Sequence, residues 1–182
     1  ALPNEFIMKN TQGSGSNYVV LDKAAIDKGK FKNLTKKWFK QDLYKRYKEW
    51  PYKNVKPRII VEELLLSGHE AIIDYKFYCF NGIIGYCGVQ YYIGKTKYQN
   101  FFDKDYNHLE VECSYLPCST NQYPVQKPKY YESMVSIAQK LSKNFKHVRI
   151  DFLGTDSNFY MGEFTFFTAS GFSEYIPDSF DF

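Results

Sequence analysis

Apolar and polar positions alternate with a period of two in residues 147–171, which predicts two β-strands joined by a turn. The turn is residues 154–158, GTDSN, which are rich in side chains that favour turns. One face of the two strands is apolar and consists of Val148, Ile150, Phe152, Tyr160, Phe164 and Phe166. In simple hairpin register, the opposite face gathers four polar side chains: Arg149, Asp151, Glu163 and Thr165.

The N-terminal third of the chain reads as short strands followed by helices. The pattern predicts, in order, a strand at Glu5–Lys9, a loop at Asn10–Asn17, a strand at Tyr18–Leu21, a short helix at Asp22–Lys28 and a longer helix at Leu34–Lys48. Gly29 would end the first helix and Asn33 would cap the second. We expect the lysines of the longer helix to form a solvated face: Lys36, Lys37, Lys40, Lys45 and Lys48.

The central segment Arg58–Leu66 is almost continuously apolar, which favours a strand buried on both faces. Glu62 and Glu63 should therefore lie where that strand leaves the core. The next predicted elements are a turn at Ser67–Glu70, strands at Ala71–Phe80, Ile83–Ile93 and Lys97–Phe102, an irregular stretch at Asp103–Pro128, a helix at Tyr131–Lys143 and an extended tail from Phe172. Asn81-Gly82 is a type I′ hairpin signal, and alternation puts Asp74 and Lys76 on one face.

Composition narrows the class of protein. The 182 residues are 44% hydrophobic and 24% charged, as in a globular domain, and the net charge of +4 is too small to argue for nucleic acid. No apolar run is long enough to cross a membrane. The four cysteines have no paired CxxC spacing, so we expect reduced thiols, a core position for Cys79 and Cys87, and a cytoplasmic protein.

The polar face of the 147–171 hairpin carries two carboxylates, a guanidinium and a hydroxyl. Mg²⁺ takes hard oxygen ligands, often one or two carboxylates completed by phosphates and water. Arg149 could neutralise charge on a transferring phosphoryl group. The pattern indicates a magnesium and phosphate site at Asp151 and Glu163, and a solvated face of cross-strand ion pairs is the alternative.

The loop Asn10–Asn17 could close over an anion, because glycines let backbone N–H groups curl around a phosphate. Lys9 at its entry would add positive charge. The loop is not a P-loop, since GxxxxGK[ST] is absent and no helix follows directly. A flexible hairpin turn is the alternative interpretation.

Four segments in chain order carry a resemblance to a known family: FIMKNTQGSGS, EWPYKNVKPRIIVEELL, DYKFYCFNG, and HVRIDF with YMGEFTFFTASGF. Together they span almost the whole chain. They resemble the ATP-grasp superfamily, in particular its TupA-like branch, named for teichuronopeptide synthesis and found among bacterial surface-polysaccharide genes. The resemblance implies an α+β fold in which two α+β subdomains with antiparallel sheets grip ATP. It implies a flap and hinge subdomain at about 1–66 and a metal-binding subdomain at about 67–182.

The resemblance also implies ATP and Mg²⁺ as cofactors. The positions that match nucleotide-binding residues are Lys9, Gln12, Gly13, Ser14, Gly15, Ser16, Glu62, Glu63, Leu64 and Asp74. Lys9 and the loop would contact phosphates, and Glu62–Leu64 would meet adenine. Asp74 would take the ribose hydroxyls, with Glu70 as its competitor.

The positions that match the metal ligands are Asp151, Glu163 and Thr165, where Thr165 replaces the usual Asn. Arg149 matches the arginine near the transferring phosphoryl group, and Lys76 would face the phosphates or the acceptor. The implied reaction activates a carboxylate as an acyl phosphate, which an amine then attacks. The implied partners are a nucleotide and a carboxylate or amine acceptor linked to a saccharide or peptide.

Members of the family carry a further region before the FIMK strand; we expect this chain to lack it, and so to bind nucleotide while turnover depends on that region. The alternatives are a non-catalytic nucleotide-binding module, a glycosyltransferase of polysaccharide biosynthesis and a basic domain that binds polyanions. No DxD-type sugar-nucleotide motif supports the glycosyltransferase.

Overall fold

A computed structural model of the chain describes residues 2–13, 15–65, 72–119 and 126–180. The chain divides into two compact units, Ala1–Gly68 and His69–Phe182. Both contain helices and antiparallel sheets, which confirms the predicted α+β class. Within the described ranges, no helix is both long and apolar enough to cross a membrane.

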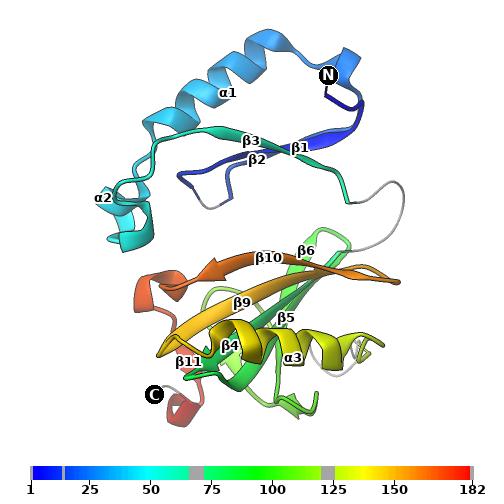
Figure 1. Cartoon of the computed structure of the whole chain (residues 1–182), viewed down its shortest axis with the longest axis vertical. Coiled ribbons are helices and arrows are strands. Elements are labelled where there is room, and N and C mark those ends of the chain that lie inside the picture. Colours follow the sequence, from blue (N-terminus) through cyan, green and yellow to red (C-terminus); the bar gives the residue numbers. More distant parts are fainter. Residues whose placement is uncertain (1, 14, 66–71, 120–125, 181–182) are drawn as a thin grey trace. The chain divides into compact units, whose positions relative to one another are not determined.

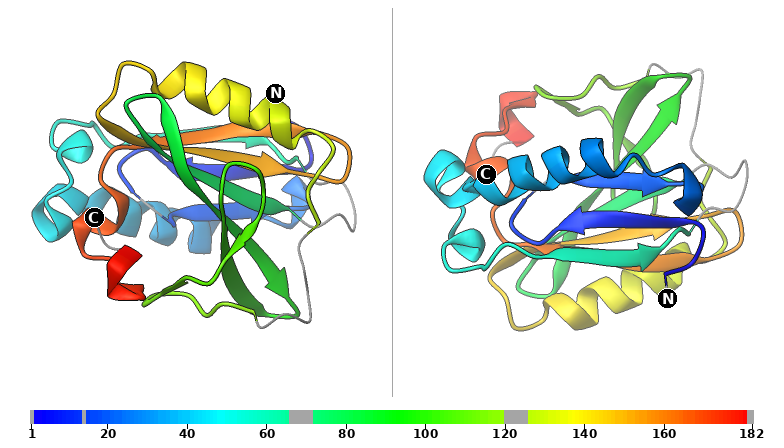
Figure 2. Two further views of the ribbon diagram at one scale, coloured as in Figure 1. Left: turned by 90° about the horizontal axis from the view of Figure 1, so that it is seen from below. Right: turned by 90° about the horizontal axis from the view of Figure 1, so that it is seen from above.

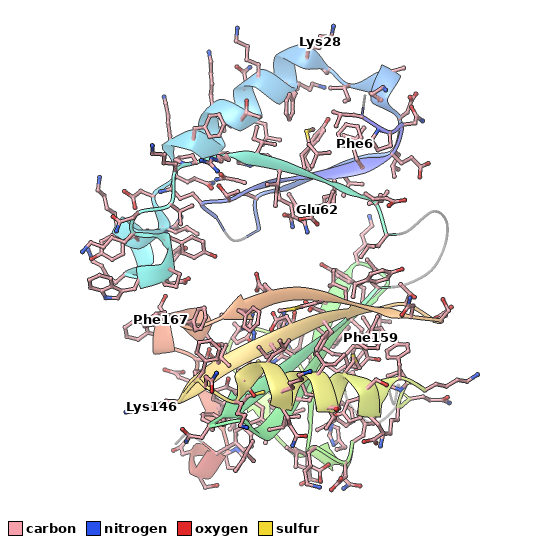
Figure 3. The ribbon with its side chains drawn as sticks, viewed as in Figure 1. Phe6, Lys28, Glu62, Lys146, Phe159 and Phe167 are labelled. Atoms are coloured by element: carbon pink, nitrogen blue, oxygen red, sulfur yellow. The ribbon has the colours of Figure 1, made fainter. Side chains whose placement is uncertain are left out.

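The first unit is a three-stranded antiparallel sheet of order β2-β1-β3, covered on one face by α1 (Figure 2). Its elements are β1 (Phe6–Asn10), β2 (Asn17–Val20), a 3₁₀ turn at Lys23–Ala25, α1 (Lys28–Lys40), α2 (Leu43–Tyr47), a 3₁₀ turn at Trp50–Tyr52 and β3 (Ile59–Glu63). Phe6, Met8 and Val20 pack with Trp38 of α1 to form its core. Figure 3 shows Phe6 between the helix and the sheet, and Glu62 on the opposite face.

The helix predictions in this unit were wrong in their boundaries. Gly29 and Asn33 both lie inside α1, which begins at Lys28, so neither ends nor caps a helix. Asp27 is the cap, because its carboxylate accepts hydrogen bonds from the backbone N–H groups of Gly29 and Lys30 at 2.8 and 2.9 Å. The long helix also breaks at Gln41, whose backbone is extended, and Asp42 caps the separate α2.

The prediction that the segment after Arg58 is buried on both faces was also wrong. β3 lies at the edge of the sheet, and all of it except Ile59 is exposed. An edge strand has only one neighbour, and the helix of this unit covers only one face of the sheet. The apolar sequence of β3 therefore does not reflect burial within the unit.

The second unit is a six-stranded antiparallel sheet of order β10-β9-β4-β5-β6-β7, with α3 lying across one face (Figure 1). Its elements are β4 (Ile73–Phe80), β5 (Ile83–Ile93), β6 (Thr96–Phe102), β7 (His108–Leu109), β8 (Glu112–Cys113), α3 (Tyr131–Ser142), β9 (His147–Gly154), β10 (Phe159–Thr165), a 3₁₀ turn at Thr168–Gly171, β11 (Tyr175–Ile176) and a 3₁₀ turn at Asp178–Phe180. The predicted irregular stretch thus contains two short strands, and the tail contributes a strand that pairs with β8.

Several predictions for this unit are confirmed. Asn81 and Gly82 have φ values of 51° and 80°, as a type I′ turn requires. Met134 and Ala138 of α3 are fully buried against the sheet, and Cys79 of β4 and Cys87 of β5 are fully buried as well. All four cysteines are unpaired.

The β9–β10 hairpin contains a β-bulge that the alternation pattern did not predict. The strands pair as Met161 with Phe152 and then as Glu163 with Asp151, so Gly162 is an extra residue. Without the bulge, Glu163 would lie opposite Ile150, on the core face. The bulge therefore puts Glu163 on the polar face, and it corrects the prediction that Tyr160 shares a face with Phe164.

Candidate functional site

Three neighbouring strands of the second unit bring the predicted polar residues together. Lys76 of β4 lies opposite Asp151 of β9, which lies opposite Glu163 of β10. In the next row that faces the same way, Arg149 of β9 lies opposite Thr165 of β10. The prediction that Arg149, Asp151, Glu163 and Thr165 share a face is confirmed, but the simple hairpin register from which it was made is wrong, because only the bulge at Gly162 turns Glu163 and Thr165 to this face.

The side chains form one network centred on Asp151. Arg149 donates from Nε and Nη2 to the two carboxylate oxygens of Asp151, both at 2.7 Å, and Lys76 donates to Oδ2 at 2.8 Å. Arg149 also donates to Glu163 Oε1 at 3.2 Å and to Thr165 Oγ1 at 3.0 Å. Thr165 in turn donates to Glu163 at 3.1 Å. A bidentate arginine–carboxylate pair is strong and fixes the geometry of both groups.

Two further charged groups extend the network across the sheet. Lys76 lies 2.9 Å from Asp74, and Lys97 of β6 lies 4.0 Å from the same carboxylate. Lys97 was not among the predicted site residues. Alternation along β6 places Lys97 on the same face as Gln99. In the register of the sheet, Gln90 of β5 pairs with Asp74 on one side and with Gln99 on the other, and this register brings Lys97 near Asp74.

Burial and charge act in opposite directions on the protonation of these groups. Burial favours the neutral form of Asp151, but Arg149 and Lys76 outweigh it and hold the pKa of the carboxyl below its usual range. Burial likewise opposes the charge of Lys76, but Asp151 and Asp74 outweigh it and raise its pKa. The pKa of Glu163 is raised, first by burial and then by the charge of Asp151. Burial lowers the pKa of Lys97.

The donor set is of the kind that Mg²⁺ prefers. Asp151, Glu163 and Thr165 offer two carboxylates and a hydroxyl on one face, and the Glu163 side chain is 59% exposed. In the parts of the chain that are described, no three His, Cys, Asp or Glu side chains are arranged to hold a metal ion. Both oxygens of Asp151 already accept from cationic groups. A magnesium ion held by these residues would therefore need further oxygen ligands, from phosphates or water, beyond those of Asp151, Glu163 and Thr165.

In the first unit, the predicted nucleotide-binding residues lie on β1, on the loop that follows it and at the end of β3. Lys9 pairs with Glu62 at 2.5 Å on the face away from α1, and Glu63 ends β3 immediately before Leu64. The loop is anchored by Ser16, which donates to Gln41 at 2.9 Å, and by Asn10, whose side chain accepts from Gln12 N–H at 3.2 Å.

Gly15 of this loop has a φ of 71°, a conformation that favours glycine, and Gly13 precedes it by two residues. Ser14 and Glu70 lie outside the described residues. The roles of Asp74 at the ribose and of Glu62–Leu64 at adenine remain predictions. Asp74 is paired with Lys76 in this structure.

Comparison with known proteins places the chain in context. A family model described as TupA-like ATPgrasp matches residues 1–182, the whole chain. No protein of curated function matches the sequence. Among solved structures, the chain resembles the crystal structure of D-alanine–D-alanine ligase from Helicobacter pylori, with a TM-score of 0.42 and 15% sequence identity. The match covers 90% of this chain and 42% of that ligase.

Proposed function

This chain belongs to the TupA-like ATP-grasp family, and from that premise we propose that it is an ATP-dependent ligase that joins a carboxylate to an amine. The observation that supports the proposal most is the network of Lys76, Arg149, Asp151, Glu163 and Thr165. It sets two cations beside two carboxylates on one small area of sheet. This is the chemistry that binds Mg²⁺ and phosphate and neutralises charge during phosphoryl transfer.

In the proposed reaction, an oxygen of the substrate carboxylate attacks the γ-phosphorus of ATP and ADP leaves, which gives an acyl phosphate. The amine nitrogen then attacks the acyl carbon, and inorganic phosphate leaves as the amide forms. Lys76 and Arg149 would hold the transferring phosphoryl group and neutralise its charge. Because this chemistry depends on positioning and electrostatics, it requires no covalent nucleophile from the protein.

Asp151, Glu163 and Thr165 are the residues that would hold Mg²⁺, which when bound screens the charge of the phosphates. We assign phosphate contacts to Lys9 and to the loop at residues 12–16, adenine contacts to residues 62–64, and ribose contacts to Asp74. The exposed Lys9 can exchange Glu62 for phosphate at small cost, since exposed ion pairs are weak.

We further propose that the acceptor is a uronic acid or peptide of a bacterial surface polysaccharide, in keeping with the family's association with teichuronopeptide synthesis. The four unpaired cysteines favour a reducing compartment, and ATP is supplied in the cytoplasm, so we place the reaction there.

Calorimetric titration of Mg-ATP tests the nucleotide site. Wild-type protein should bind Mg-ATP, and Asp151→Asn/Glu163→Gln should lose that binding. The matched control is Glu174→Gln/Asp178→Asn, which removes the same charge from exposed positions of the same unit and should bind normally. Absence of binding to the folded wild-type protein, or equal binding by the site variant, would contradict the assignment.

A non-catalytic nucleotide-binding module is the second candidate. It is favoured by Thr165, which stands where the family has an Asn ligand, and by Asp151, whose two oxygens are already engaged. Hydroxylamine separates the two, because it converts an acyl phosphate to a stable hydroxamate. Hydroxamate formed with ATP and a uronic acid would support the ligase, whereas ATP binding without hydroxamate or ADP would support the module. Binding of a UDP-sugar in place of ATP would point instead to a glycosyltransferase.

A further inference from the structure

Residues 28–58 carry a charge that the site described above does not use. This segment has 12 Lys and Arg and two Asp and Glu, a net charge of +10, whereas the rest of the chain has 12 and 18, a net charge of −6. The modest overall charge of +4 therefore conceals a strongly basic region, which we call the basic segment. It comprises α1, α2, the 3₁₀ turn at Trp50–Tyr52 and the irregular segment that leads to β3.

The positive charge of α1 lies in a continuous row. Lys28, Lys32, Lys36 and Lys40 follow one another at intervals of four residues, so they form a ridge about 18 Å long on one side of the helix. All four are exposed, and Trp38 on the opposite side is buried against the sheet. In Figure 3, nitrogen-tipped side chains of α1, including Lys28, point away from the strands.

Among the residues that the structure describes, no ion pair is given for the four lysines of this ridge. α1 contains no Asp or Glu, and like charges four residues apart destabilise a helix. The ion pairs that the structure gives for the basic segment are Lys30 with Asp27 at 3.9 Å and Lys45 with Asp42 at 3.4 Å. A solvated helix face usually mixes both signs of charge. The repulsion along this ridge would be relieved by an external anionic surface.

Exposed aromatic side chains accompany the lysines. Phe39 is 47% exposed and lies three residues after Lys36, on the side of the ridge, and Trp50 is 59% exposed. The ammonium of Lys53 lies 4.1 Å from the centre of the Trp50 ring, which packs edge-on against Tyr44. Cations beside exposed Trp, Tyr and Phe are typical of protein surfaces that lie in the headgroup region of a membrane.

We propose that the basic segment docks this protein onto a membrane surface that carries anionic phospholipid headgroups. A straight ridge on the outside of a helix suits a planar array of phosphates, whereas single-stranded nucleic acid is usually bound in a groove that follows its backbone. The lysines supply attraction to the headgroups, and Phe39, which lies on the side of the ridge, enters the boundary with the acyl chains. This docking is independent of the ligase proposal, because it uses none of the residues of the nucleotide site.

Vesicle flotation tests the proposal. The whole chain should float with vesicles of phosphatidylcholine and phosphatidylglycerol, should not float with phosphatidylcholine alone, and should be released by salt. Lys32→Glu/Lys36→Glu should lower partition at least about tenfold. The matched control is Lys129→Glu/Lys146→Glu, which makes the same charge change at exposed positions of the second unit and should float almost as wild type. Circular dichroism of each variant verifies folding.

A second variant tests the aromatic contribution. Phe39→Ala should release the protein from anionic vesicles at a lower salt concentration than wild type, because less apolar surface enters the membrane. Equal partition of wild type and Lys32→Glu/Lys36→Glu would overturn the proposal, as would absence of partition into anionic vesicles. Binding to a single-stranded oligonucleotide at an ionic strength that prevents vesicle binding would overturn it in favour of nucleic acid.

Discussion

Each unit contains a lysine paired with a carboxylate on a neighbouring strand, and the two pairs differ in burial. The side chains of Lys9 and Glu62 in the first unit are 31% and 45% exposed, whereas those of Lys76 and Asp151 in the second are 10% and 4% exposed. In the described parts of the chain, no third charged group joins the first pair, whereas the second belongs to a network with a bidentate arginine. An exposed pair can be exchanged for a ligand at little cost, but a buried one holds its partners in fixed positions.

The largest expected effect is on the buried network. Asp151→Ala would leave Lys76 and Arg149 buried without their shared partner, and we expect it to reduce the free energy of unfolding by about 3–5 kcal/mol. Urea denaturation measures the change. Glu62→Ala makes the corresponding truncation in the exposed pair and should cost less than about 1 kcal/mol. Similar losses from the two variants would show that burial does not distinguish the pairs.

The next effect is the dependence of stability on pH. The pKa of Asp151 is lower in the folded protein than in the unfolded chain, so its contribution is complete above the unfolded pKa of about 4 and is lost as pH falls through the folded value. Glu163, with its raised pKa, contributes in the opposite sense, since the folded protein then binds its proton more tightly.

Urea denaturation at a series of pH values down to about pH 3 tests this dependence. The difference in stability between wild type and Asp151→Asn should be constant near neutrality and should shrink in acid. A difference that does not change with pH would mean that the pKa of Asp151 is the same in the folded protein as in the unfolded chain.

The sequence predicted the polar face of the hairpin because alternation depends only on local backbone geometry. It placed Arg149 and Asp151 correctly, as it did the neighbours Asp74 and Lys76. It could not predict Lys97, which reaches Asp74 only through the register of three strands. Helix boundaries failed where Asp27, rather than Asn33, had the geometry to cap α1. The apolar composition of β3 suggested burial, but position in the sheet decides exposure.

A smaller effect is expected at the bulge that aligns the site. A Cβ atom on Gly162 would lie 3.2 Å from the carbonyl oxygen of Asp151, so β10 would have to shift by a few tenths of an ångström. We expect Gly162→Ala to cost about 1 kcal/mol and to weaken Mg-ATP binding, because Glu163 and Thr165 move relative to Arg149. Gly171→Ala is the comparison outside the network: because Gly171 has a φ of 80°, the substitution should also lower stability, but it should leave the affinity for Mg-ATP unchanged. A Gly162→Ala protein with unchanged affinity would show that the bulge does not set the geometry of the site.

The smallest effect on stability is expected at Lys9. A double-mutant cycle with Lys9→Ala and Glu62→Ala should give a coupling energy below about 1 kcal/mol, because the pair is exposed and isolated. Affinity for Mg-ATP should separate the two residues. Lys9→Ala removes a proposed phosphate contact and should weaken binding. Glu62→Ala frees Lys9 from a competing carboxylate and leaves the backbone groups of residue 62 in place.

If Glu62 meets adenine mainly through its backbone, Glu62→Ala should bind Mg-ATP as tightly as wild type or more tightly. Calorimetric titration of the three variants measures this. Equal weakening by Lys9→Ala and Glu62→Ala would mean that the nucleotide requires the intact ion pair. Lys9 would then position Glu62 instead of binding phosphate. The exposed pair, like the buried one, would have to stay intact for its function.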